Sequence, residues 1–183
     1  MYSSPAPRYR CRPISYSVGL LVLLASLLGP ASAFAACTGA SALPTSASAA
    51  EGATLCLVND ERRSHGLAGL RENGELSAAS ARHARDMAER GYFGHTSPDG
   101  RSFTDRIKAA GYVRGAENYS VGENLGWGSG ETAAPDAIVA AWMASPGHRA
   151  NILSPRFKEI GFGMASGGQG GRTLYATDFG TTR

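Results

Sequence analysis

Apolar residues recur every three or four positions between residues 75 and 90, the spacing that gathers them on one face of an α-helix. The residues on that face are Leu76, Ala79, His83 and Met87. Gly91 follows, and glycine readily adopts the left-handed conformation that ends many helices. The pattern predicts an amphipathic helix over residues 75–90. His83 then reads as a hydrogen-bonded core histidine, with a ligand role as the alternative.

Three more helices are predicted from shorter patterns. A first helix carries the polar run at residues 59–65 on its outer face and ends at Gly66. Another covers residues 102–110, with Ser102 suited to cap its first turn and with Phe103, Ile107 and Ala110 facing inward. A fourth covers residues 135–144. Because proline cannot continue a helical hydrogen-bond ladder, Pro146 and the glycine after it predict a sharp corner.

The end of the chain changes to a period of two. Ile160, Phe162 and Met164 alternate with small residues, and a second alternating run follows at residues 174–179. The glycine-rich segment 167–171 joins them, so the two runs predict a β-hairpin. Residues 121–125 fit either a short strand or a turn, and residues 126–130 a loop. The predicted fold is α+β, an α-β-α sandwich with about four helices around a small antiparallel sheet.

The first 35 residues have the order of a secretory signal peptide. Three arginines come first, an apolar run follows at residues 14–28, and small residues then offer cleavage sites near Ala33 to Ala36. The apolar run is shorter than the roughly 20 residues of a membrane-spanning helix. We therefore expect a secreted or periplasmic protein without a transmembrane anchor, with a flexible Ala/Ser-rich arm at residues 36–50 and one domain at residues 51–183.

Removing the leader changes the charge balance. Three of the 18 basic residues lie in it and all 15 acidic residues follow it, so the remaining chain has a net charge of 18 − 3 − 15 = 0. A neutral chain without a basic stripe argues against nucleic acid as a partner.

Two cysteines, Cys37 and Cys56, remain after the leader. In an oxidising compartment they most simply form one disulfide, which stabilises by about 3 kcal/mol in the chain-entropy description. A lipid-modified Cys37 is the alternative, which Phe34 disfavours because a small aliphatic residue is expected at that position.

Three titratable residues each directly follow a glycine, and they are the candidates for binding or catalysis: His95, Glu123 and His148. Two imidazoles, one carboxylate and a water are a ligand set that suits zinc or another divalent metal. The same groups suit general acid–base catalysis. Spacing alone does not bring them together, and in the alternative each histidine satisfies backbone groups locally.

Four ordered motifs resemble the CAP superfamily, which comprises cysteine-rich secretory proteins, antigen 5 and pathogenesis-related proteins and is also called the SCP domain. The motifs lie at residues 92–100, 122–125, 142–153 and 159–163, and the third is similar to the bacterial branch. The resemblance implies a central cleft lined by His95, Glu123 and His148. Animal and plant members typically have a second glutamate where this chain has Ser145, and Glu131 and Asp178 could replace it by residue type only.

The resemblance and the export signal favour an extracellular binding module. Its cleft would hold a divalent metal or a small apolar or lipid-like ligand, and its partner would be such a ligand or a cell-wall component. No Gly-x-Ser-x-Gly motif occurs, and both remaining cysteines are expected to pair. The alternative is a metal-dependent hydrolase, a peptidase or cell-wall enzyme, in which His95 and His148 hold zinc and Glu123 activates water.

Overall fold

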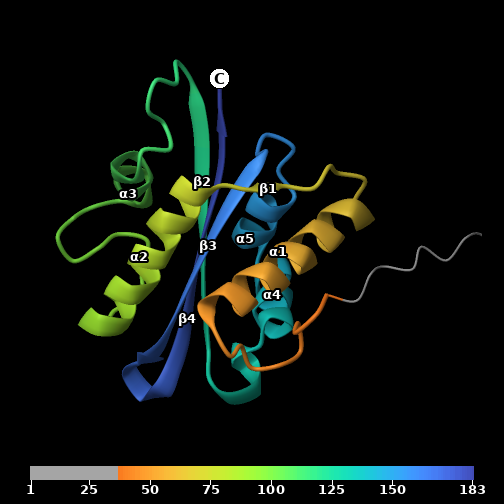
Figure 1. Cartoon of the computed structure of the whole chain (residues 1–183), viewed down its shortest axis with the longest axis vertical. Coiled ribbons are helices and arrows are strands. Elements are labelled where there is room, and N and C mark those ends of the chain that lie inside the picture. The colour runs from red at the N-terminus through yellow and green to blue at the C-terminus, as the bar shows by residue number, and fades with distance from the viewer. Residues whose placement is uncertain (1–36) are drawn as a thin grey trace, which may run out of the picture. The chain divides into compact units, whose positions relative to one another are not determined.

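The computed structural model describes residues 37–183, so the predicted signal peptide lies outside the described residues. Within this part, no helix is long and apolar enough to cross a membrane. Five α-helices and four strands form the domain (Figure 1). The helices are α1 (Ala47–Ser64), α2 (Gly74–Arg90), α3 (Phe103–Ala110), α4 (Pro135–Ala144) and α5 (Pro146–Ile152). The strands are β1 (Arg71–Glu72), β2 (Tyr119–Gly128), β3 (Glu159–Gly168) and β4 (Arg172–Thr182), and short 3₁₀ turns η1 (Gly130–Ala133) and η2 (Gln169–Gly171) complete the order.

The strands form one sheet in the order β1-β3-β4-β2. The predicted β3–β4 hairpin is confirmed, and β4 also pairs antiparallel with β2. The three long strands form the predicted antiparallel sheet, and the two-residue β1, which was not predicted, pairs parallel with β3 and makes the sheet mixed. Two residues are too few to show an alternating pattern, which is why the sequence did not reveal β1.

The predicted loop at residues 126–130 was also wrong in part, because β2 continues to Gly128. Glycine at this position reflects close packing and not a loop. A Cβ on Gly128 would lie 2.0 Å from the carbonyl oxygen of Thr132 in η1. Only a residue without a side chain lets the strand and the following turn approach this closely.

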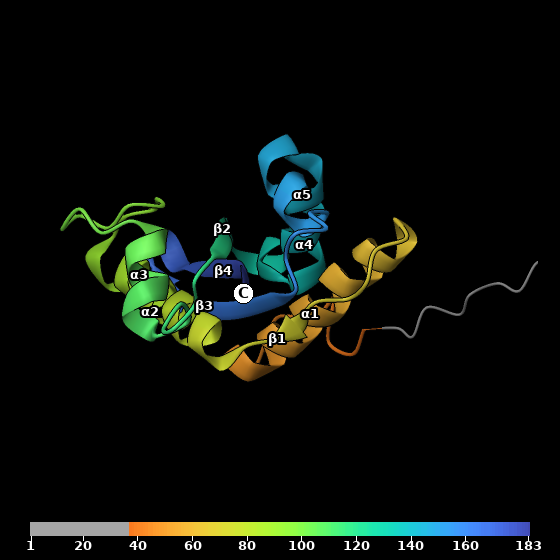
Figure 2. The same cartoon turned by 90° about the horizontal axis from the view of Figure 1, so that it is seen from above.

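The sheet is covered on both faces, which confirms the α-β-α sandwich. Figure 2 shows α2 and α3 on one side and α1, α4 and α5 on the other. On the first side α2 buries Leu76, Ala79, His83 and Met87, the face predicted from its periodicity. A Cβ on Gly161 of β3 would lie 2.1 Å from the backbone nitrogen of Ser77, so glycine in the strand allows α2 to pack directly on the sheet.

The corner predicted at Pro146 is the start of a fifth helix. Ser145, in extended conformation, ends α4 and begins α5, and Pro146 occupies the first turn of α5. Proline is tolerated there because the first helical N–H groups have no intrahelical acceptor. His148 therefore lies on a short helix and not on a turn.

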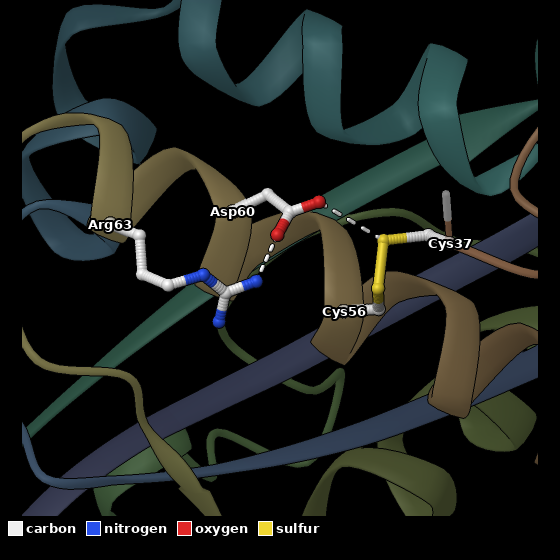
Figure 3. The surroundings of a disulfide bond; sticks show 4 residues. All are labelled: Cys37, Cys56, Asp60 and Arg63. Atoms are coloured by element: carbon white, nitrogen blue, oxygen red, sulfur yellow. Dashed lines mark hydrogen bonds and ion pairs between the residues drawn. A yellow bond between two sulfur atoms is a disulfide. The ribbon is translucent and has the colours of Figure 1, made fainter. Parts of the chain in front are cut away.

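The segment before α1 is tied to that helix by the predicted disulfide. Cys37 and Cys56 are bonded, with their Cα atoms 5.7 Å apart, and a disulfide leaves no free thiol for lipid attachment at Cys37 (Figure 3). Asp60, one turn after Cys56, places Oδ2 3.3 Å from the sulfur of Cys37 and also pairs with Arg63. The helix begins at Ala47, so the last four residues of the expected arm belong to α1.

Candidate functional site

The first contact of the site joins two of the predicted residues. His95 lies in the segment between α2 and α3, and Glu123 lies on β2. Nδ1 of His95 is 2.8 Å from Oε1 of Glu123. The imidazole is 52% exposed, whereas the carboxylate side chain is fully buried. A surface histidine is therefore held in place by a carboxylate that bulk water does not reach.

Arg106, which was not predicted from the sequence, holds the other oxygen of that carboxylate. Its Nη2 donates to Oε2 of Glu123 over 2.7 Å, and its side chain is only 7% exposed. Nη1 donates to the carbonyl oxygens of His95 and Arg101 at 3.0 and 3.1 Å. One guanidinium thus neutralises Glu123 and fixes the segment that carries His95. Charge-assisted hydrogen bonds of this kind are the stronger ones in proteins.

His83 lies beside the same carboxylate but does not bind it. Its Nε2 donates to the carbonyl oxygen of Gly94 over 3.0 Å and is 3.9 Å from Oε2 of Glu123. Burial lowers the pKa of His83, an effect that the negative charge of Glu123 opposes. The predicted role of a hydrogen-bonded core histidine is confirmed, and the residue helps to fix the backbone just before His95.

Asp178 is the neighbour of Glu123 on β4, where the two residues are direct cross-strand partners. The hydroxyl of Ser80 donates to Oδ2 of Asp178 over 2.8 Å, and Oδ1 has no partner among the described residues. Burial raises the pKa of Asp178 well above its usual value, and the charge of Glu123 raises it further. Asp178 is therefore a buried carboxyl group whose charged form is disfavoured, which makes it a poor replacement for the family's second glutamate. Glu131 is exposed on η1, and no hydrogen bond or ion pair within residues 37–183 joins it to this cluster.

His148 is positioned by amide side chains that join α5 to β2. Asn124 donates from Nδ2 to the carbonyl oxygen of His148 over 3.1 Å. Asn151 donates to Oδ1 of Asn124 at 2.9 Å and to the carbonyl oxygen of Glu123 at 3.2 Å. Burial lowers the pKa of His148, and the positive charge that His95 can carry lowers it further. The backbone of His148 is thus fixed beside β2, and the lowered pKa favours the neutral form of its imidazole.

The three predicted residues do not form a ready three-ligand metal centre. Within residues 37–183, the one group of three histidine, cysteine or acidic side chains whose ligand atoms lie within 4.8 Å is Cys37, Cys56 and Asp60. Those two sulfurs form a disulfide and are not thiolate ligands. Both oxygens of Glu123 are already hydrogen-bonded. Glu123 therefore fits the role of a carboxylate that orients an imidazole, not that of a direct ligand.

The same contacts bear on Glu123 as a general base. A base that activates water must reach that water within hydrogen-bond distance. Glu123 is buried, and Arg106 and His95 occupy its two oxygens. Of the His95 and Glu123 side chains, only the imidazole of His95 is exposed to solvent.

The chain is similar in sequence to a known protein family and to bacterial proteins. Residues 55–179 match the cysteine-rich secretory protein family, CAP. The chain belongs to this family. An uncharacterized protein of Bacillus subtilis, YkwD, is 38% identical over 127 residues, which is 68% of this chain and 46% of that protein. The chain spans less than half the length of the curated relatives that it matches.

Solved structures support the CAP fold. An extracellular protein containing a SCP domain from Bacillus anthracis superposes with a TM-score of 0.61 and 25% identity, over 73% of this chain and 40% of that one. An outer surface protein from Borrelia burgdorferi has a TM-score of 0.58 and 19% identity, over 69% of this chain and 88% of that one. The second likeness is one of fold alone.

Proposed function

We propose that this CAP domain is an extracellular binding module whose binding groups are the imidazoles of His95 and His148. One observation carries the proposal: an exposed imidazole is fixed through Nδ1 to a buried carboxylate. Nε2 of His95 has no hydrogen-bond partner among residues 37–183 and is left for a ligand. A histidine that binds a metal through one nitrogen commonly uses its other nitrogen in this way.

Two features of the chain and one relative support an extracellular location. The first 35 residues have the pattern of a secretory signal peptide. The disulfide between Cys37 and Cys56 is of a kind that persists in oxidising compartments. The related structure from Bacillus anthracis is of an extracellular protein.

The ligand class that fits the two imidazoles best is a divalent metal ion such as zinc, for which neutral histidine nitrogen is a common ligand. The lowered pKa of His148 favours the neutral form that a metal requires. Because Glu123 is occupied and Ser145 replaces the family's second glutamate, the protein would supply two ligands and water the rest. We therefore expect zinc to bind more weakly than in sites with four protein ligands. A small apolar or lipid-like molecule held beside the imidazoles is the other ligand class.

Calorimetric titration with zinc tests the proposal. The purified protein is compared with His95→Ala, His148→Ala and, as a matched control, His65→Ala, an exposed histidine at the end of α1. We expect each cleft substitution to weaken zinc binding at least tenfold and the control to leave it unchanged. Equal affinity in all four proteins would exclude the metal site. Displacement of a fluorescent fatty acid, lost only in the cleft variants, would then assign the apolar ligand.

A hydrolase is the second candidate, and the His95–Glu123 contact favours it. An imidazole oriented by a buried carboxylate is the arrangement of a general base. His95, not Glu123, would then take the proton from water. Turnover of labelled peptides or peptidoglycan fragments that disappears in His95→Ala supports this function. If the wild-type protein turns over neither substrate, the hydrolase is excluded for these substrates and the binding module is retained.

A further inference from the structure

A hollow that contains neither His95 nor His148 lies at the end of the sheet where β2 begins and β4 ends. In Figure 1 this is the end that carries the C-terminus. Its cavity volume is about 280 Å³, close to the lower limit of about 300 Å³ for small-molecule pockets. Six residues line it: Asn118, Tyr119, Ser120, Arg156, Thr181 and Arg183. None of them belongs to the site described above.

The hollow carries an excess of positively charged side chains. Its lining holds two guanidinium groups and no Asp or Glu side chain. Neither Arg156 nor Arg183 takes part in an ion pair within residues 37–183, where other arginines do. The ammonium of Lys108 adds a third cation, 5.6 Å from the centre of the Tyr119 ring. The 15 basic and 15 acidic residues after the leader balance, so this local excess is not a consequence of overall charge.

The backbone around the hollow is fixed by hydrogen bonds between the ends of β2 and β4. The N–H of Arg183 donates to the carbonyl oxygen of Asn118 over 2.9 Å, and the main-chain oxygen of Arg183 accepts from the backbone N–H of Glu117 at 3.1 Å. Tyr119 pairs with Thr182 in the sheet, yet its side chain is 42% exposed. An exposed aromatic ring, two forked donors and several hydroxyl and amide groups therefore share one rim.

We propose that this hollow binds a carboxylate-bearing sugar unit of an extracellular polysaccharide. The planar guanidinium matches a carboxylate with two parallel hydrogen bonds. The Tyr119 ring offers an apolar face for the C–H face of a sugar ring, and its phenol offers a polar tip. The side chains of Asn118, Ser120 and Thr181 can donate to and accept from sugar hydroxyls. A polymer partner would fix the domain at a cell surface while the histidine cleft stays free.

The probe is tetragalacturonic acid, titrated calorimetrically against the purified protein with any tag at the N-terminus. Its methyl-esterified form is the neutral counterpart. We expect the acid form to bind at least tenfold more tightly than the ester. Arg156→Gln and Tyr119→Ala should each weaken binding of the acid at least tenfold. Zinc affinity should stay unchanged in both variants, so failure here is distinguishable from failure of the proposed function.

The other end of β2 supplies matched controls. Trp127 is also exposed, and the guanidinium of Arg172 lies 4.1 Å from the centre of its ring. Trp127→Ala and Arg172→Gln remove the same kinds of groups and should leave binding unchanged. Unchanged binding in Arg156→Gln, or loss confined to the control variants, would overturn the assignment. Inorganic phosphate binding as tightly as the oligosaccharide would also overturn it, because the hollow would then be a site for small anions only.

Discussion

Replacing Arg106 by methionine should destabilise the domain severely, because it removes the partner of a buried carboxylate. The Arg106 side chain is 7% exposed, Glu123 is fully buried, and their contact is 2.7 Å. Removing one member of a buried ion pair typically costs about 3–5 kcal/mol, since the other charge is left without compensation. Total stabilities are about 5–15 kcal/mol, so the variant would be close to unfolding. Methionine keeps much of the side-chain length, which limits the contribution of a cavity.

The loss should be smaller when Glu123 is changed as well. In Arg106→Met/Glu123→Gln no charge is buried, and we expect the double variant to be about 1.5–3 kcal/mol more stable than the sum of the two single effects. Urea unfolding followed by tryptophan fluorescence measures this, because Trp142 is buried in the core. Arg85→Met, an exposed position on α2, is the control and should change stability by less than about 0.5 kcal/mol. A loss below about 1 kcal/mol in Arg106→Met, or strictly additive single effects, would refute the reasoning.

Three further outcomes follow from the fold. Replacing Cys37 and Cys56 by serine should cost about 3 kcal/mol, measured as the difference between urea unfolding of the two proteins; no loss would mean that the bond does not constrain the unfolded chain. Gly161→Ala should destabilise the domain by more than about 3 kcal/mol, because the new Cβ would clash with the backbone of α2. Gly52→Ala is the control, since its Cβ would meet nothing within 4 Å, and it should stabilise α1 by up to about 1 kcal/mol. The raised pKa of Asp178 means that the folded state keeps a proton that the unfolded state loses near pH 4, so the contribution of this group to stability is lost as pH rises. Asp178→Asn should therefore gain stability relative to the wild type by up to about 1.4 kcal/mol per pH unit above pH 4 in urea titrations, and parallel curves would contradict this.

The elements that the sequence predicted well are those with a complete pattern. The apolar face of α2 contains four residues at helical spacing, and the β3–β4 hairpin has alternation on both sides of a glycine-rich connection. α5 was missed because Pro146 ends one helix and also suits the first turn of another, and only tertiary packing decides between the two. His95 and Glu123 are 28 residues apart, so their spacing does not show that they meet. Only the family resemblance led us to expect them at one site.

Arg106 was missed although the sequence carries a signal for it. The inward positions of α3 are Phe103, Ile107 and Ala110, and Arg106 is three residues after the first and four before the last. A charged residue at that spacing on an apolar face must find a buried partner of opposite charge. The rule indicates that Arg106 needs a carboxylate. It does not say which one, because Glu123 comes from a strand that the chain reaches only after another loop.

The segment from Trp142 to Ile152 covers the free edge of the sheet, and the same segment carries His148. β2 is an edge strand, and an edge strand with free carbonyl groups can pair with other chains. The indole of Trp142 donates to the carbonyl oxygen of Leu125 over 2.9 Å, and Asn151 donates to that of Glu123. The strand edge that needs these donors is the one that carries the site carboxylate. Because the same segment contains His148, the packing that covers the strand edge also fixes the backbone of this histidine beside β2.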